Sequence, residues 1–127
     1  MLMLDTQTLV WYLTGDKKLG PRSTRTLVDA DVLYFSSLSI LEYEIKLSDR
    51  SLGGGRQLLQ AATAKGLEEL FPTGKELERA SDFPSLRKHD PIDRALVLQA
   101  AWHNATFFTS DRKLLDLGLT WVHDSQD

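Results

Sequence analysis

The chain has 127 residues, of which 42% are apolar and 26% charged, so it has the composition of one folded domain over 1–127 and not of a disordered tail. It has no cysteine, which excludes disulfides, thiolate zinc sites and cysteine nucleophiles, and its formal charge of −3 argues against a generic nucleic-acid binder. The acidic residue Asp5 comes too early for the apolar stretch of a signal peptide and no apolar run reaches the ~20 residues that span a bilayer, so we expect a soluble, cytoplasmic protein.

Short apolar runs alternate along the chain with segments whose apolar residues recur at helical spacing. In chain order we expect a strand over 1–4, a helix over 6–14, a helix from 21, a strand over 32–35, a helix from 39, a helix over 56–65, a strand over 67–71, a helix over 75–80, a helix from 91 to about 104, a strand over 106–109, a helix over 111–117 and a strand over 119–122. Strands that alternate with helices and lack hairpin turns indicate a parallel sheet covered on both faces. We therefore expect an α/β fold, a three-layer α/β/α sandwich around a mostly parallel central sheet of four to five strands.

Individual residues indicate where some helices begin and which faces are buried. Asp90 followed by Pro91 is the strongest helix start, because an acidic N-cap precedes a proline at the first helical position. Ser39 is the expected N-cap of the third helix, and the glycines at 53–55 are expected to form a flexible connection. The apolar faces that we expect to be buried on the second and third helices consist of Leu27, Val28, Leu41, Ile45 and Leu47.

Four acidic residues fall near the ends of the expected strands. Asp5 directly follows the first strand, and Asp111 lies two residues past the strand over 106–109. Glu42 lies early in the helix after the second strand, and Asp93 lies in the first turn of the helix that precedes the fourth. Because ligand sites in open parallel sheets lie beyond the carboxyl ends of the strands, we expect these four carboxylates to meet at one edge of the sheet.

Each of these acids also has a purely structural interpretation. Asp5 and Asp111 can cap helices, Asp93 suits a helix N-terminus, and Glu42 can pair with Lys46 one turn along its helix. Gathered together, however, two bare carboxylates ~4 Å apart repel by about 4 kcal/mol at an effective dielectric of roughly 20. A hard divalent cation would neutralise them, and all-oxygen ligation favours Mg²⁺ or Mn²⁺ over zinc. Such an ion activates water and offsets charge on phosphoryl oxygens, which points to phosphodiester hydrolysis.

Four segments carry a resemblance to a known family. They are LDTQTLVWYL at 4–13, SSLSILEYEIK at 36–46, HDPIDRALVLQA at 89–100 and TSDRKL at 109–114. Together they resemble the PIN-domain ribonucleases, specifically the VapC-like toxins of bacterial toxin–antitoxin pairs. The helix start DPxDR followed by T-x-D is the most specific part, and the similarity covers nearly the whole chain.

The resemblance implies a site, a cofactor and partners. By motif, the family's acidic quartet falls on Asp5, Glu42, Asp93 and Asp111, and its supporting polar residues fall on Thr6 and Thr109. In the family the quartet holds Mg²⁺ or Mn²⁺ for endonucleolytic cleavage of RNA. The resemblance further implies a homodimer and a cognate VapB-like antitoxin that blocks the cleft. Glu44 adds a second acid beside Glu42, and the spacing to Lys46 favours Glu42.

Basic and aromatic residues near these acids allow contacts with a nucleic acid. We expect phosphate contacts from Arg87, Lys88, Arg94 and Arg112. The alternative is that Arg87 and Lys88 lie in a solvated loop and that Arg94 pairs with Asp90, four residues before it. The aromatic residues Trp11, Tyr12 and Trp102 can stack on bases, but aromatic residues at helical spacing are more typical of packing in the core or a dimer surface.

Three other functions compete with a metal-dependent nuclease. A catalytically silent relative would bind RNA without turnover. A phosphoacceptor receiver domain has a similar size and an acidic pocket, but it needs an acidic pair after the first strand, where Thr6 follows Asp5. Metal-free acid–base cleavage of RNA would need paired histidines, and among His89, His103 and His123 only His89 is expected near the crevice.

Overall fold

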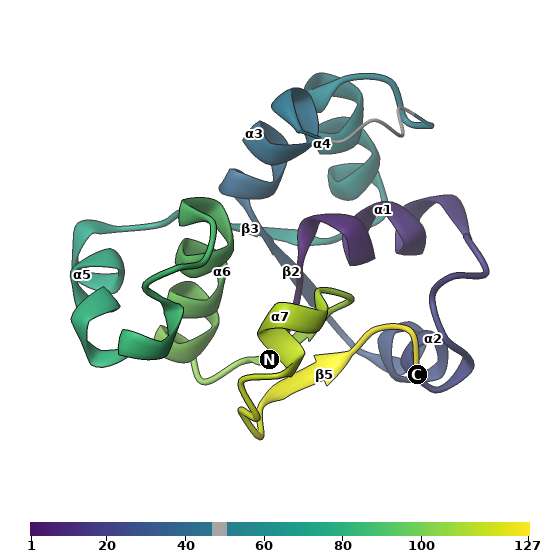
Figure 1. Ribbon diagram of the computed structural model, residues 1–127. Helices are drawn as coiled ribbons and strands as arrows, with labels where there is room; N and C mark the ends of the chain where they lie inside the picture. The colour runs from purple at the N-terminus through teal and green to yellow at the C-terminus, as the bar shows by residue number, and fades with distance from the viewer. Residues whose placement is uncertain (47–50) are drawn as a thin grey trace.

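The structure is a computed structural model that describes residues 1–46 and 51–127 (Figure 1). Its strands are β1 (Leu2–Leu4), β2 (Leu33–Ser36), β3 (Glu68–Leu70), β4 (Thr106–Thr109) and β5 (Val122–Asp124). Its helices are α1 (Thr6–Thr14), α2 (Pro21–Asp29), α3 (Ser37–Ile45), α4 (Gly55–Ala64), α5 (Gly74–Leu77), α6 (Pro91–Trp102) and α7 (Arg112–Leu115), with short 3-10 helices η1 (Glu78–Asp82) and η2 (Pro84–Leu86). The expected helix from 39 therefore begins at Ser37, and most other elements lie within a few residues of their expected positions.

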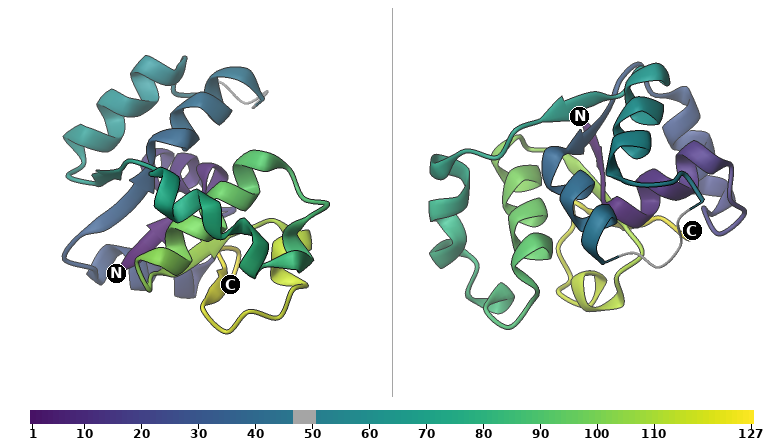
Figure 2. Two further views of the ribbon diagram at one scale, coloured as in Figure 1. Left: turned by 90° about the vertical axis from the view of Figure 1, so that its left-hand side faces the viewer. Right: turned by 90° about the horizontal axis from the view of Figure 1, so that it is seen from above.

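The strands form one parallel sheet in the order β3-β2-β1-β4-β5, which has five strands in the part of the chain that the structure describes. Successive residues of a strand face opposite sides of a sheet, so Met3 and Phe107 pack on one side and Leu4 and Phe108 on the other. Figure 2 shows α5 and α6 on one side of the sheet and α1 and α4 on the other. The expected α/β/α sandwich with a mostly parallel sheet is thus confirmed.

The start of α3 differs from the expectation because no loop separates it from β2. The N-cap is Ser36, whose hydroxyl accepts a hydrogen bond from the Leu38 N–H at 3.1 Å. Ser39, the expected N-cap, is a buried residue inside the helix. The strand end itself thus caps the helix, and the first turn of α3 is fixed directly to the sheet edge.

The buried helix faces were predicted only in part. Leu27 is buried as expected, but Val28 is 64% exposed, because the next position along a helix lies about 100° around its axis. On α3 the buried aromatic residue is Tyr43, whereas Leu41 and Ile45 are 50% and 62% exposed. The expectation for Leu47 lies outside the described residues.

Three further boundaries are corrected. The last strand is β5 and not 119–122, because Leu119 and Val122 are joined in a turn by a backbone hydrogen bond of 3.1 Å and pairing with β4 starts only at Val122. The helix after Asp111 ends at Leu115, and that after residue 74 continues as the 3-10 helix η1. Of the glycines at 53–55, Gly55 opens α4 and donates its N–H to Glu44 Oε2 at 2.5 Å.

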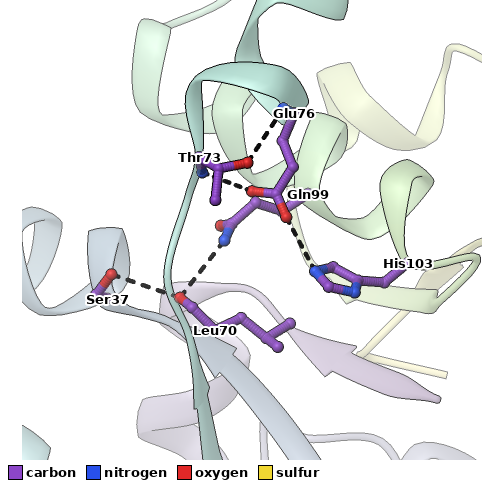
Figure 3. A network of polar contacts seen from close by, with 6 residues as sticks. All are labelled: Ser37, Leu70, Thr73, Glu76, Gln99 and His103. Carbon is purple, nitrogen blue, oxygen red and sulfur yellow. Dashed lines mark hydrogen bonds and ion pairs between the residues drawn. The ribbon is translucent and has the colours of Figure 1, made fainter.

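A buried carboxylate joins α5 to α6. Glu76 is 3% exposed, and its Oε2 accepts the N–H of Thr73 at 2.8 Å while its Oε1 lies 3.0 Å from Nε2 of His103 (Figure 3). The Thr73 hydroxyl in turn accepts the Glu76 N–H at 3.4 Å, which completes a capping box at the start of α5. This one side chain therefore both caps α5 and fixes it against the end of α6.

Replacing Glu76 with alanine should cost about 1–3 kcal/mol of unfolding free energy, because it leaves the Thr73 N–H and the His103 ring without their acceptor. Glu76→Gln keeps an acceptor oxygen and should cost less. Urea unfolding at neutral pH measures both changes. An alanine variant that unfolds at the same urea concentration as the unchanged protein would contradict this role.

The end of β3 holds two of the helices that frame the sheet edge. The carbonyl oxygen of Leu70 accepts from Ser37 Oγ and from Gln99 Nε2, both at 3.4 Å (Figure 3). Ser37 opens α3, which carries Glu42, and Gln99 lies on α6, which carries Asp93. The two acids therefore project from helices that are fixed to the same strand end.

Candidate metal centre

Asp5 stands at the point where β1 ends and α1 begins. Its backbone N–H donates to the Phe108 carbonyl at 2.9 Å, its Oδ1 accepts the Thr8 N–H at 2.8 Å as the N-cap of α1, and its Oδ2 accepts from Thr109 Oγ1 at 2.5 Å. Burial raises the pKa of this carboxyl; the hydrogen bonds from Thr109 and Thr8 oppose the rise, and nearby Glu42 adds a small contribution to it. Asp5 is thus a buried carboxylate with a fixed orientation.

Thr109 and Asp111 extend this arrangement to the next strand. Thr109 is fully buried at the end of β4, and its hydroxyl oxygen accepts the N–H of Asp111 at 3.0 Å while the hydroxyl proton goes to Asp5. Asp111 caps α7 by accepting the Lys113 N–H at 2.8 Å. A continuous chain of hydrogen bonds therefore ties the carboxyl ends of β1 and β4 together.

The other two predicted acids approach from the flanking helices. Carboxylate oxygens of Glu42 on α3 and of Asp90 and Asp93 at the start of α6 all lie within 4.8 Å of one another. Burial raises the pKa of Asp93 to about 7, with further upward contributions from Glu42, Asp111 and Asp90. Of the four predicted acids, the structure brings the carboxylates of Glu42 and Asp93 close together with that of Asp90, whereas Asp5 and Asp111 lie outside this group at the carboxyl ends of β1 and β4.

Sequence reasoning assigned Asp90 to the helix cap and, as an alternative, to an ion pair with Arg94, and it missed the place of Asp90 in this group. Its Oδ1 accepts the N–H groups of Ile92 at 2.9 Å and Asp93 at 3.4 Å, and its Oδ2 forms an ion pair with Lys46. This ion pair lowers the pKa of Asp90 and raises the pKa of Lys46. Within the described ranges Lys46 therefore pairs across to α6, and the alternative of an ion pair with Glu42 one turn away is wrong.

The second glutamate of α3 points elsewhere. Glu44 Oε2 accepts the N–H of Gly55 at the start of α4, so this carboxylate faces the α3–α4 side of the helix. Residues two apart on a helix do not share a face, which explains why only Glu42 lies beside Asp93.

The hydroxyl of Thr6 donates to Ser39 Oγ at 2.9 Å, so this threonine connects α1 to α3.

The predicted basic residues lie in different surroundings. Arg87 and Lys88 are exposed just before α6, and Nη1 of the half-buried Arg94 is 3.5 Å from the Arg87 carbonyl. The guanidinium of Arg112 forms an ion pair with Asp124. The alternative in which Arg94 pairs with Asp90 is wrong, since the acid pairs with a lysine instead, and the phosphate contacts stay predictions.

The aromatic residues and histidines have other contacts. Trp11 is buried in the core, whereas Trp102 is 42% exposed with the Arg79 guanidinium 5.7 Å from its ring. His103 contacts Glu76, and the His123 ring lies 5.6 Å from that of Phe108. These contacts pair neither His103 nor His123 with another histidine, which gives no support to paired-histidine chemistry.

The donor set fits a hard divalent cation. The closely spaced donors are carboxylate oxygens, the ligand type that Mg²⁺ and Mn²⁺ prefer. The raised pKa of Asp93 reflects burial and crowding by like charges, both of which a bound cation would relieve. These residues could therefore hold such an ion, although their role as ligands stays a prediction.

Comparisons with known proteins support the fold. A model of the PIN domain family matches residues 2–118. A chain from a toxin–antitoxin complex of Klebsiella pneumoniae has a TM-score of 0.69 at 14% identity, over 98% of each chain. VapC20 of Mycobacterium tuberculosis, described as a toxin that cleaves the sarcin–ricin loop, has a TM-score of 0.64 at 16% identity, over 97% of this chain and 99% of its own. A comparison with curated protein sequences finds no match. None of the helices in the described ranges has the length and apolarity that a bilayer crossing requires.

Proposed function

This chain belongs to the PIN domain family, and from that premise we propose that it is a metal-dependent endoribonuclease that acts as the toxin of a toxin–antitoxin pair. The observation that carries the proposal is the close approach of carboxylates from α3 and the start of α6, together with the acids Asp5 and Asp111 that follow the carboxyl ends of β1 and β4. On this proposal the 127 residues work as a single PIN domain.

We assign the metal to the predicted acidic quartet. In this assignment Asp5, Glu42, Asp93 and Asp111 hold Mg²⁺ or Mn²⁺. When bound, such an ion activates water for attack on phosphorus and offsets the charge that develops on the phosphoryl oxygens. The protein's own contribution is to orient the carboxylates, and the hydroxyl of Thr109 does so for Asp5.

RNA is the proposed substrate. The exposed Arg87 and Lys88 would contact its phosphates beside the acids, and the half-buried Arg94 would add a further positive charge. Arg112 could also contact phosphate if its ion pair with Asp124 opens. The description of VapC20 as a toxin that cleaves an RNA loop supports this substrate class by analogy of fold.

The proposed partners are a VapB-like antitoxin and a second copy of the chain. The structural likeness to a chain of a toxin–antitoxin complex supports an antitoxin. The exposed apolar side chains of Val28, Leu41 and Ile45 provide surface that a protein partner could cover. The proposed compartment is the cytoplasm, where RNA and an antitoxin are both available.

The purified protein should cleave RNA in the presence of Mn²⁺ or Mg²⁺ and stop when a chelator is added, leaving a 5′-phosphate on the downstream fragment. Electrophoresis of end-labelled RNA with analysis of the fragment ends measures this. Expression should also arrest growth, and co-expression of a small DNA-binding protein encoded beside this gene should relieve the arrest.

Two outcomes would contradict the proposal. Cleavage that resists chelator and leaves cyclic phosphates would favour histidine chemistry, of which His89 would be the first candidate. RNA binding without cleavage in any divalent metal would indicate a catalytically silent relative. A receiver domain remains disfavoured, because β3 leads into Phe71 and Pro72 where an acceptor aspartate would be needed.

A further inference from the structure

The acidic group already contains a cation that belongs to the protein. Lys46 lies at the end of α3, and its ammonium pairs with Asp90 Oδ2 at the start of α6. Its charge also acts on Glu42 and Asp93. Glu42, Asp90 and Asp93 are the three residues whose carboxylate oxygens lie within 4.8 Å of one another.

The acids fall into two halves with different partners. In one half, the buried hydroxyl of Thr109 donates to the Asp5 carboxylate and accepts the backbone N–H of Asp111. In the other half, Asp90 has both oxygens engaged, since Oδ1 accepts two backbone N–H groups and Oδ2 holds the ammonium of Lys46. A divalent ion among the second group would therefore compete with this ammonium for Asp90 Oδ2.

We propose that the Lys46 ammonium is a resident cation beside Glu42, Asp90 and Asp93 and takes the place of a second divalent ion there, so that the chain binds a single divalent ion. The inference rests on the proposed function, because it assumes that the acids hold a divalent ion at all. Asp93 belongs to both halves, since its charge interacts with Glu42 and with Asp111.

The physical reason is that two cations in one group of acids repel each other and compete for the same carboxylate oxygens. An ammonium brings one positive charge and three N–H donors, which suits a group of carboxylates that is partly open to water. A second divalent ion placed beside it would meet a positive charge at short range and would compete with the ammonium for Asp90. Lys46 is thus a positioning residue, which acts through Asp90 and Glu42 and needs no contact with the reacting atoms.

The test is the number of Mn²⁺ ions that each metal-stripped chain binds at pH 7.5, measured by calorimetry and by the spin resonance of free Mn²⁺. We expect one ion for the unchanged protein and two for Lys46→Met, because the freed carboxylates become available. Lys46→Gln keeps a polar partner for Asp90 without the charge and should also bind two. Lys46→Arg keeps the charge and should bind one, as should Lys75→Met, the matched loss of an exposed lysine on α5. Circular dichroism establishes that each variant is folded.

Other outcomes separate this inference from the proposed function. Two ions on the unchanged protein, or one ion on both Lys46→Met and Lys46→Gln, would overturn the role of Lys46 while leaving a metal-dependent nuclease intact. If no variant binds Mn²⁺, the proposed function itself fails and this inference fails with it. Because the readout is metal binding without RNA, a loss of catalytic activity alone cannot be mistaken for either result.

Discussion

Replacing Asp93 with asparagine should reduce RNA cleavage at least about 10²–10³-fold at saturating Mn²⁺, because it removes a charged carboxylate from the closely spaced group that is proposed to hold the ion. The amide keeps the size of the side chain, so the start of α6 and the Asp90 cap should persist. Initial rates on a labelled RNA, with circular dichroism of the variant, measure the effect.

The same substitution should stabilise the protein when no metal is present. Burial and the like charges of Glu42 and Asp111 raise the pKa of Asp93 from 3.8 to about 7. The folded chain therefore binds a proton more tightly than the unfolded chain, and its free energy of unfolding falls as pH rises from about 4 to about 7. Asparagine carries no such charge, so the variant should be more stable by about 1–3 kcal/mol at pH 8, and the difference should vanish near pH 4.

Urea unfolding in chelator across this pH range checks the stability, with Asp31→Asn as the control, since Asp31 is an exposed acid in the loop before β2. That control should leave both cleavage and the pH dependence unchanged. If the folded Asp93→Asn protein cleaves RNA at the full rate, Asp93 is not a functional part of the metal centre. If the unfolding curves of Asp93→Asn have the same pH dependence as those of the unchanged protein, Asp93 is not the group whose raised pKa lowers stability at high pH.

The strands near the site could be predicted well because their local sequence patterns indicate a strand without ambiguity. Residues 1–4 and 106–109 are short apolar or β-rich runs that stop at a polar residue, and β1 and β4 lie there. The last strand was misplaced because 119–122 is similarly apolar, and its pairing is decided by the register of Phe107 against Val122. Register is a tertiary property, so a local pattern could not reveal it.

The helix faces show a similar limit. Leu41 and Ile45 have the spacing of a buried stripe, yet the helix presents Tyr43 to the core. The orientation of α3 follows from its direct connection to β2 at Ser36 and from the contact of Ser39 with Thr6. Periodicity indicates which residues share a face, but the contacts of the whole fold decide which face is buried.

Topology could predict that Glu42 and Asp93 lie close together, but it could not predict the partners of the acids. The assignment of Asp5, Glu42, Asp93 and Asp111 as one set of metal ligands stays a prediction. The Lys46–Asp90 pair joins residues 44 apart in sequence, and a lysine four residues after Glu42 suggested a local pair instead. Tertiary packing brings Lys46 to Asp90 instead of to Glu42. The inference about the number of bound metal ions rests on this Lys46–Asp90 ion pair.

Replacing Thr109 with valine should weaken Mn²⁺ binding about 10–100-fold, because the hydroxyl that orients Asp5 is lost while the shape of the side chain is kept. The Asp111 N–H loses its acceptor as well, so the free energy of unfolding should fall by about 1–3 kcal/mol. Thr109→Ser keeps the hydroxyl and should bind Mn²⁺ nearly as well as the unchanged protein. Calorimetric titration with Mn²⁺ and urea unfolding measure the two effects separately.

A variant at a second buried threonine distinguishes the loss of the hydrogen bond that orients Asp5 from a general loss of stability. The Thr6 hydroxyl donates a hydrogen bond to Ser39 and not to an acid of the quartet. Thr6→Val should therefore lower stability but weaken Mn²⁺ binding much less than Thr109→Val does. Cleavage by Thr109→Val should partly recover at high Mn²⁺, because Asp5 itself is still present. If Thr6→Val weakens Mn²⁺ binding as much as Thr109→Val does, the hydrogen bond to Asp5 has no special role in the metal centre.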